Sequence, residues 1–142
     1  STFWTERIGP TAALKTLDVM EQSKSWVKIT DIGKGICTRW QALAGKYGLP
    51  IDIYGLPALA GFAFESPHAQ AYKTLITQEM LKKRYLAGDC IYVCTEHDDA
   101  IIDGYIDALD PIFQLIRDCE DGRDVGTLLD GPVCHSRFNR LN

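Results

Sequence analysis

The sequence predicts an α+β fold, with a small antiparallel sheet of about three strands and helices packed on one face. Two observations lead to this prediction. Apolar residues recur every three or four positions over four long stretches, which is the spacing of amphipathic helices. Between these stretches lie short β-prone runs bounded by glycine and proline, which are typical of strands. Strands and helices in this order favour a small sheet covered on one side.

Two helices are predicted in the first third of the chain. The first has Pro10 in its first turn and ends near Ser23, and its apolar residues form a stripe. The second runs over about 26–47, where aromatic and branched residues recur at helical intervals. Gly33 and Gly35 weaken the middle of this helix, because glycine is a poor helix former.

The middle of the chain predicts a pair of strands and a third helix. The runs 51–54 and 59–65 are short, β-prone and separated by Gly55 and Pro57. The helix that follows is predicted to be capped at Ser66-Pro67 and to continue to Leu86, with Gly88 closing it.

A third strand and a fourth helix complete the predicted fold. The strand is 90–94, and Asp98 or Asp99 then caps a helix that extends to about residue 116. Pro111 should kink this helix or split it in two. The remainder, 119–142, is rich in Asp, Gly and Arg, so we expect a mostly irregular tail.

Composition excludes several classes of partner. The 142 residues suit one compact domain, and their net charge of −4 with interspersed signs leaves no basic face for nucleic acid. The apolar stretch 56–64 is far shorter than the roughly 20 residues that cross a bilayer, so no membrane partner is predicted. Five cysteines are an odd number that argues against a disulfide framework, so we expect reduced thiols and a cytoplasmic protein.

The cysteine and histidine pattern predicts no metal ligand, and no catalytic residue is assigned. Cys90 and Cys94 would lie about 13 Å apart along a strand, too far to share one ion. The run 96–99 could be an acid/base cluster, but a helix cap beside a solvated His97 explains it without further assumption. Binding of a metal or thiol redox chemistry would require the cysteines to converge in space.

The chain nevertheless resembles one enzyme family along essentially its whole length. The opening run from Ser1 to Leu14 resembles a segment of class III aminotransferases related to glutamate-1-semialdehyde 2,1-aminomutase, which depend on pyridoxal 5′-phosphate (PLP). The order of the predicted elements and the ending from Gly131 to Asn142 resemble the same family. The resemblance implies the small C-terminal domain of a fold-type I PLP enzyme.

That resemblance implies an incomplete enzyme. In the family a lysine of the large domain forms a Schiff base with PLP, and the small domain closes over the site. We therefore expect that lysine upstream of Ser1 and no activity in isolation. The implied division is 1–25 as cofactor-phosphate segment and connecting helix, 26–118 as small domain and 119–142 as tail.

The resemblance also implies one cofactor contact and two partners. Thr2, with Ser1 beside it, matches the threonine that contacts the phosphate of PLP bound by the neighbouring subunit, which implies a homodimer. The other partner is the large PLP-binding domain of the same protein. PLP is expected in the parent enzyme and not on this chain alone, whose eight lysines all lie in polar, helical contexts. The run 3–7 departs from the Ser/Gly-rich turn of the family.

One alternative function stays open. The chain could be a stand-alone, non-catalytic interaction module that has kept the small-domain fold. Its opening lacks an initiator methionine and a secretory signal, so we expect a piece of a longer protein.

Overall fold

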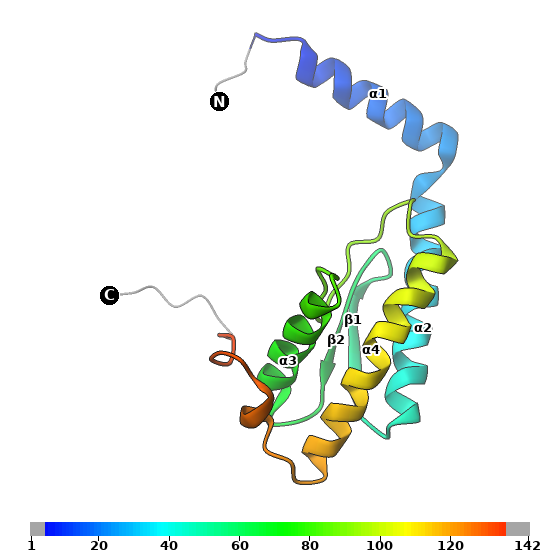
Figure 1. Ribbon diagram of the computed structural model, residues 1–142. Coiled ribbons are helices and arrows are strands. Elements are labelled where there is room, and N and C mark those ends of the chain that lie inside the picture. The colour runs from blue at the N-terminus through cyan, green and yellow to red at the C-terminus, as the bar shows by residue number, and fades with distance from the viewer. Residues whose placement is uncertain (1–4, 136–142) are drawn as a thin grey trace.

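The computed structural model describes residues 5–135 and shows an α+β fold. One body holds a two-stranded antiparallel sheet and three of the four helices, and the first helix projects away from it (Figure 1). The elements are α1 (Ile8–Ser23), α2 (Ser25–Lys46), β1 (Ile51–Leu56), β2 (Leu59–Phe64), α3 (Ala69–Lys82), α4 (Asp99–Glu120) and the short 3-10 helix η1 (Val125–Leu128).

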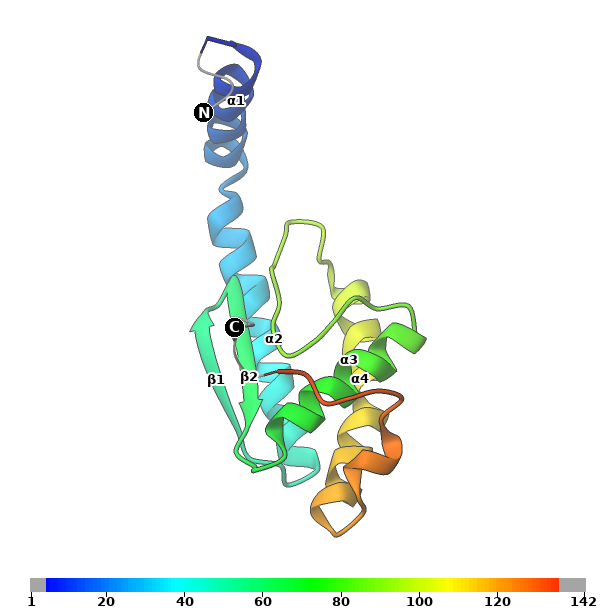
Figure 2. The same ribbon diagram turned by 90° about the vertical axis from the view of Figure 1, so that its left-hand side faces the viewer.

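The two strands form a hairpin with one buried face. They pair antiparallel, with Ile53 opposite Phe62 and Leu56 opposite Leu59. Because side chains alternate along a strand, Phe62 and Phe64 are buried against the helices while Asp52 and Tyr54 remain exposed. Figure 2 shows the hairpin on one flank of the body and α3 and α4 on the other.

The expected third strand at 90–94 is not a regular strand. This segment lies beside β2, where Ile91 N–H donates to the carbonyl of Ala60 at 2.9 Å and Phe62 N–H donates to the carbonyl of Asp89, just before the segment, at 2.9 Å. It has a single isolated bridge, between Gly61 and Cys90. The pairing stops early because Val93 already bonds to Ala58, which lies in the hairpin turn before β2 begins.

The core lies between the hairpin and α2, α3 and α4. Trp40 of α2 is fully buried and packs on Phe62, with ring centroids 4.9 Å apart. Phe113 of α4 closes the other side of Phe62, at 5.9 Å. The indole N–H of Trp40 donates to the Tyr105 hydroxyl at 3.0 Å, so the polar atom of this large side chain is also satisfied.

Gly33 is a packing residue and not only a weak point of α2. A Cβ placed on it would lie 1.9 Å from the backbone oxygen of Pro57 in the hairpin turn. The absence of a side chain therefore allows α2 to lie directly against that turn. Nothing lies within 4 Å of the Cβ position of Gly35, so the second glycine has no such role.

Helix α3 is shorter than predicted at both ends. It begins at Ala69, because Ser66 accepts a hydrogen bond from the His68 N–H at 3.2 Å and so forms a turn before the helix. It ends before Gly88 because Arg84 takes the left-handed conformation, with φ of 68°. The N–H groups of Arg84 and Tyr85 then bond back to α3 carbonyls, as in a Schellman cap.

Helix α4 is one continuous helix, so of the two outcomes predicted at Pro111, a kink or a split, the split does not occur. Its cap is as predicted, since the Asp98 side chain accepts from the Ile101 N–H at 2.8 Å. A proline inside a helix removes the bond to the carbonyl four residues earlier, here that of Asp107. The Lys83 ammonium donates to the neighbouring carbonyl of Ala108 at 3.0 Å and adds a contact to this turn.

After α4 the chain turns back along α3. The side-chain amide of Gln78 donates to the carbonyl of Leu128 at 2.8 Å and accepts from the N–H of Asp130 at 2.7 Å. One turn earlier on α3, Thr74 accepts from the N–H of Cys134 at 3.0 Å. Polar side chains one turn apart on α3 thus hold this segment in place.

Helix α1 is built differently from the rest. Every one of its residues is exposed, and it meets α2 at Lys24, whose φ of 47° is left-handed. This conformation costs a residue with a Cβ roughly 1–2 kcal/mol. Within residues 5–135, none of the helices combines the length and apolar composition that a membrane-spanning segment needs.

Candidate functional site

The two residues predicted to contact a cofactor phosphate, Ser1 and Thr2, lie outside the described residues. The structure does describe the start of the helix that follows them. There the Glu6 carboxylate accepts hydrogen bonds from the N–H groups of Ile8, at 2.8 Å, and Gly9, at 2.7 Å. Because these helix-start donors are already paired, a phosphate would bind through residues before Glu6 or by displacing its side chain.

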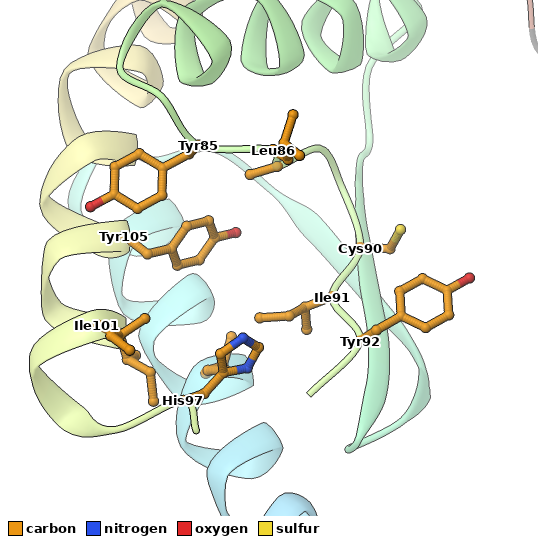
Figure 3. Close-up of a pocket in the computed structure, with 11 residues that line it drawn as sticks. Tyr85, Leu86, Cys90, Ile91, Tyr92, His97, Ile101 and Tyr105 are labelled. Carbon is orange, nitrogen blue, oxygen red and sulfur yellow. The ribbon is translucent and has the colours of Figure 1, made fainter. Parts of the chain in front are cut away.

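An apolar cleft of about 300 Å³ opens between the 85–97 segment, the middle of α2 and the first turns of α4. Figure 3 shows Tyr85 and Leu86 at one end of it and His97 and Ile101 at the other. This volume is at the small end of the range for small-molecule sites. The cleft is lined by Ile36, Tyr85, Leu86, Ala87, Cys90, Ile91, Tyr92, His97, Ile101, Ile102 and Tyr105.

Two polar groups of the cleft are held by neighbours. The Tyr105 hydroxyl accepts from Trp40, and burial raises the pKa of this phenol, so it stays protonated at neutral pH. His97 Nδ1 accepts from the backbone N–H of Cys94 at 3.4 Å. This arrangement can hold an apolar group beside a hydrogen-bond donor. It does not pair a nucleophile with a base.

Three of the eight lysines have surroundings opposite to those that covalent attachment of PLP requires. A Schiff-base lysine needs an apolar setting that lowers the pKa of its amine. Here hydrogen bonds to Asp110, Asp89 and Glu79 raise the pKa of Lys46, Lys73 and Lys82, respectively. All eight lysines belong to the described residues, and the cleft is lined by none of them. No step of PLP chemistry is therefore assigned to this part of the chain.

The other perturbed groups have structural roles. The Glu120 carboxylate accepts from the hydroxyls of Tyr72, at 2.6 Å, and Ser66, at 2.7 Å, and these bonds lower its pKa. They join the start of α3 to the end of α4. The cysteines are free thiols, and burial raises the pKa of Cys37 and Cys119. Among residues 5–135, no three His, Cys, Asp or Glu side chains are placed to share a metal ion.

The apolar side of α1 has no partner among the described residues. Leu14 and Leu17 are 65% and 60% exposed, and Met20 lies one turn further along the same face. We call these three residues the α1 stripe. Contiguous exposed apolar side chains mark contact surfaces in soluble proteins. The projecting position of α1 in Figure 1 leaves this stripe accessible to a partner.

Sequence reasoning found the α1 stripe and missed the cleft. The stripe is local, because residues three and four positions apart share one face of a helix. The cleft combines Ile36 of α2 with Tyr85, Ile91 and Tyr105, which are far apart in sequence. The local signal for the cleft is the apolar character of 85–93, which predicts the end of one helix followed by a strand.

Comparison with known proteins gives one informative likeness. No family model matches the chain, and no curated protein matches it. Among solved structures, the PLP internal aldimine form of the FumI protein of Sphingopyxis sp. MTA144 is similar, with a TM-score of 0.72 and 16% sequence identity. The match covers 91% of this chain and 32% of that one. The chain therefore spans about a third of a protein whose fold it shares over nearly all of its own length.

Proposed function

We propose that this chain is the small C-terminal domain of a PLP-dependent class III aminotransferase, of the glutamate-1-semialdehyde 2,1-aminomutase type. The observation that carries the proposal is the fold likeness, which takes in nearly all of this chain but a third of the FumI chain. A domain of this kind is one part of the catalytic unit. The parent enzyme exchanges or moves an amino group on a small aldehyde or keto substrate.

The cofactor belongs to the proposed large domain. When bound there, PLP supplies the aldehyde that forms a Schiff base and an electron sink for the reaction. The described lysines support this division of labour, because hydrogen bonds to carboxylates hold three of them in the charged form. Ser1 and Thr2 are proposed to contact the PLP phosphate of the neighbouring subunit in a homodimer.

The contribution of this chain is a rigid body with a projecting contact helix. The buried core fixes the shape of α2, α3, α4 and the hairpin. The α1 stripe supplies apolar surface for the large domain, since Leu14 and Leu17 stay mostly exposed among the described residues. The free thiols support a reducing compartment, and we propose the cytoplasm.

The first test asks whether this chain carries PLP chemistry alone. The purified chain is incubated with PLP, reduced with borohydride and analysed by intact mass, with heat-unfolded chain as the control for unspecific labelling of exposed lysines. We expect equal labelling of both samples and no turnover of amino donors. A stoichiometric pyridoxyl adduct at one lysine of the folded chain would overturn the proposal.

The second test separates the proposal from its alternative, a stand-alone interaction module with the same fold. The coding DNA upstream of Ser1 is read. The enzyme proposal requires an in-frame large domain with a lysine for PLP, and a start codon beside Ser1 would instead establish the module. The α1 stripe would then bind another protein.

A further inference from the structure

The junction between α1 and α2 is held in a conformation that its sequence does not favour. Lys24 has φ of 47° and ψ of 42°. In this left-handed region the Cβ crowds the following carbonyl oxygen, so glycine occupies it readily and lysine rarely. The Lys24 side chain makes no capping hydrogen bond to the start of α2.

The backbone hydrogen bonds change at the bend. Lys24 N–H reaches the carbonyl of Glu21 at 3.4 Å, and Val27 N–H reaches that of Lys24 at 2.9 Å. The N–H groups that cap α1 bond to the carbonyls of Glu21 and Met20. In a continuous helix each N–H would bond to the carbonyl four residues earlier, so straightening the junction exchanges these bonds for helical ones.

Little packing opposes a change of this bend. Every residue of α1 is exposed, and an open groove of about 490 Å³ separates its Lys15 and Val19 from the 93–95 loop. Reorienting α1 therefore uncovers little buried apolar surface. The angle between α1 and α2 therefore depends mainly on the backbone conformation of Lys24.

We propose that Lys24 is a hinge with two backbone states. In the bent state it is left-handed, as described here. In the other state it is right-handed, and α1 and α2 merge into one straight helix from Ile8 to Lys46. A partner that touches both the α1 stripe and the body selects the bent state. The identification of this partner as the large domain rests on the proposed function. The two backbone states of the junction are independent of it.

The hinge can be tested on the whole chain by pulsed electron dipolar spectroscopy. A keto-bearing amino acid replaces Thr11 and Lys34, both exposed, and carries the spin labels, so the native cysteines stay untouched. A straight helix places these two Cα atoms about 35 Å apart, and the bent state brings them closer. The compared proteins are the parent, Lys24→Gly, Lys24→Ala and the control Lys28→Ala.

Glycine relieves the crowding of the bent state, and alanine favours the straight helix. We expect the ratio of short to long distances to be at least about fivefold higher in Lys24→Gly than in Lys24→Ala. Lys28→Ala should match the parent, because Lys28 is helical in both states. The same ratio in all four proteins would overturn the hinge. This readout needs neither PLP nor a large domain, so it fails or succeeds independently of the proposed function.

Discussion

Helices α1 and α2 have the same spacing of apolar residues, but the apolar face of α1 is exposed and that of α2 is buried. Leu14 and Leu17 of α1 are mostly exposed, whereas Ile36 and Trp40 of α2 are fully buried. The spacing determines that each helix has an apolar face. It does not determine what covers that face, because the cover comes from elements distant in sequence or from another domain.

This difference divides the molecule into a self-sufficient body and a dependent helix. Among the described residues, no buried side-chain nitrogen or oxygen lacks a hydrogen-bond partner, and the body has one continuous hydrophobic core. Helix α1 adds no buried residue to that core. The substitutions below test how far this division holds, from the largest expected effect to the smallest.

Replacing the core tryptophan of α2 should have the largest effect. Trp40→Ala should lower the free energy of unfolding by about 3–5 kcal/mol, because it removes a fully buried ring and leaves a cavity. Trp26→Ala, in the first turn of the same helix and 46% exposed, should cost far less. Urea unfolding followed by circular dichroism measures both. Equal losses would show that the core is not centred on Trp40.

The two glycines of α2 form a second matched pair. Gly33→Ala should destabilise by about 1–3 kcal/mol, since the new methyl group would overlap the Pro57 oxygen. Gly35→Ala should stabilise by about 0.5–1 kcal/mol, because alanine is the better helix former and the position is open. Thermal unfolding of both variants is the measurement. A stable Gly33→Ala protein would show that α2 does not lie against the hairpin turn.

Acidification should weaken the body through Glu120. Hydrogen bonds from Tyr72 and Ser66 hold the pKa of its carboxyl below the ordinary 4.5. The stability they give is therefore present above about pH 4.5 and lost as pH falls through the lower folded-state pKa. Because Glu120 is exposed, the loss should stay below about 1 kcal/mol. Glu120→Gln should reduce the loss of unfolding free energy below about pH 4.5. An unchanged dependence on pH would exclude a contribution of Glu120 to this loss.

The smallest effect is expected on the α1 stripe. Leu17→Ala should change the free energy of unfolding by no more than about 0.5 kcal/mol, because the side chain is already 60% exposed. Ile112→Ala, at a buried position of α4, provides the contrasting value of about 2–5 kcal/mol. A large loss in Leu17→Ala would mean that α1 packs on the body in solution.

Local patterns predicted most of the fold. Apolar spacing placed all four helices, and the Asp98 cap and the hairpin follow from residues that act on their near neighbours. The predicted helix ends and breaks were wrong where a rare backbone conformation or a residue distant in sequence was involved. Arg84 ends α3 before Gly88 by a left-handed conformation usual for glycine, and α4 continues through Pro111 with Lys83 of another segment beside its preceding turn.

The site was less predictable than the fold. Ser1 and Thr2 were assigned through a family resemblance, and they stay a prediction because the described residues begin after them. The cleft could not be predicted, because Tyr105 reaches it only when α4 packs on α2. The third strand predicted at 90–94 is reduced to an isolated bridge between Gly61 and Cys90 beside a two-stranded sheet.

The bond between Trp40 and Tyr105 joins residues 65 positions apart, and this separation determines when the protein can fold during synthesis. As the chain leaves the ribosome, α2 and the hairpin emerge before α4, so Trp40 and Phe62 lack their contacts with Tyr105 and Phe113 until α4 follows. Such transiently exposed apolar surface is prone to aggregation. The order of synthesis therefore places the completion of the aromatic core at the arrival of the last long helix.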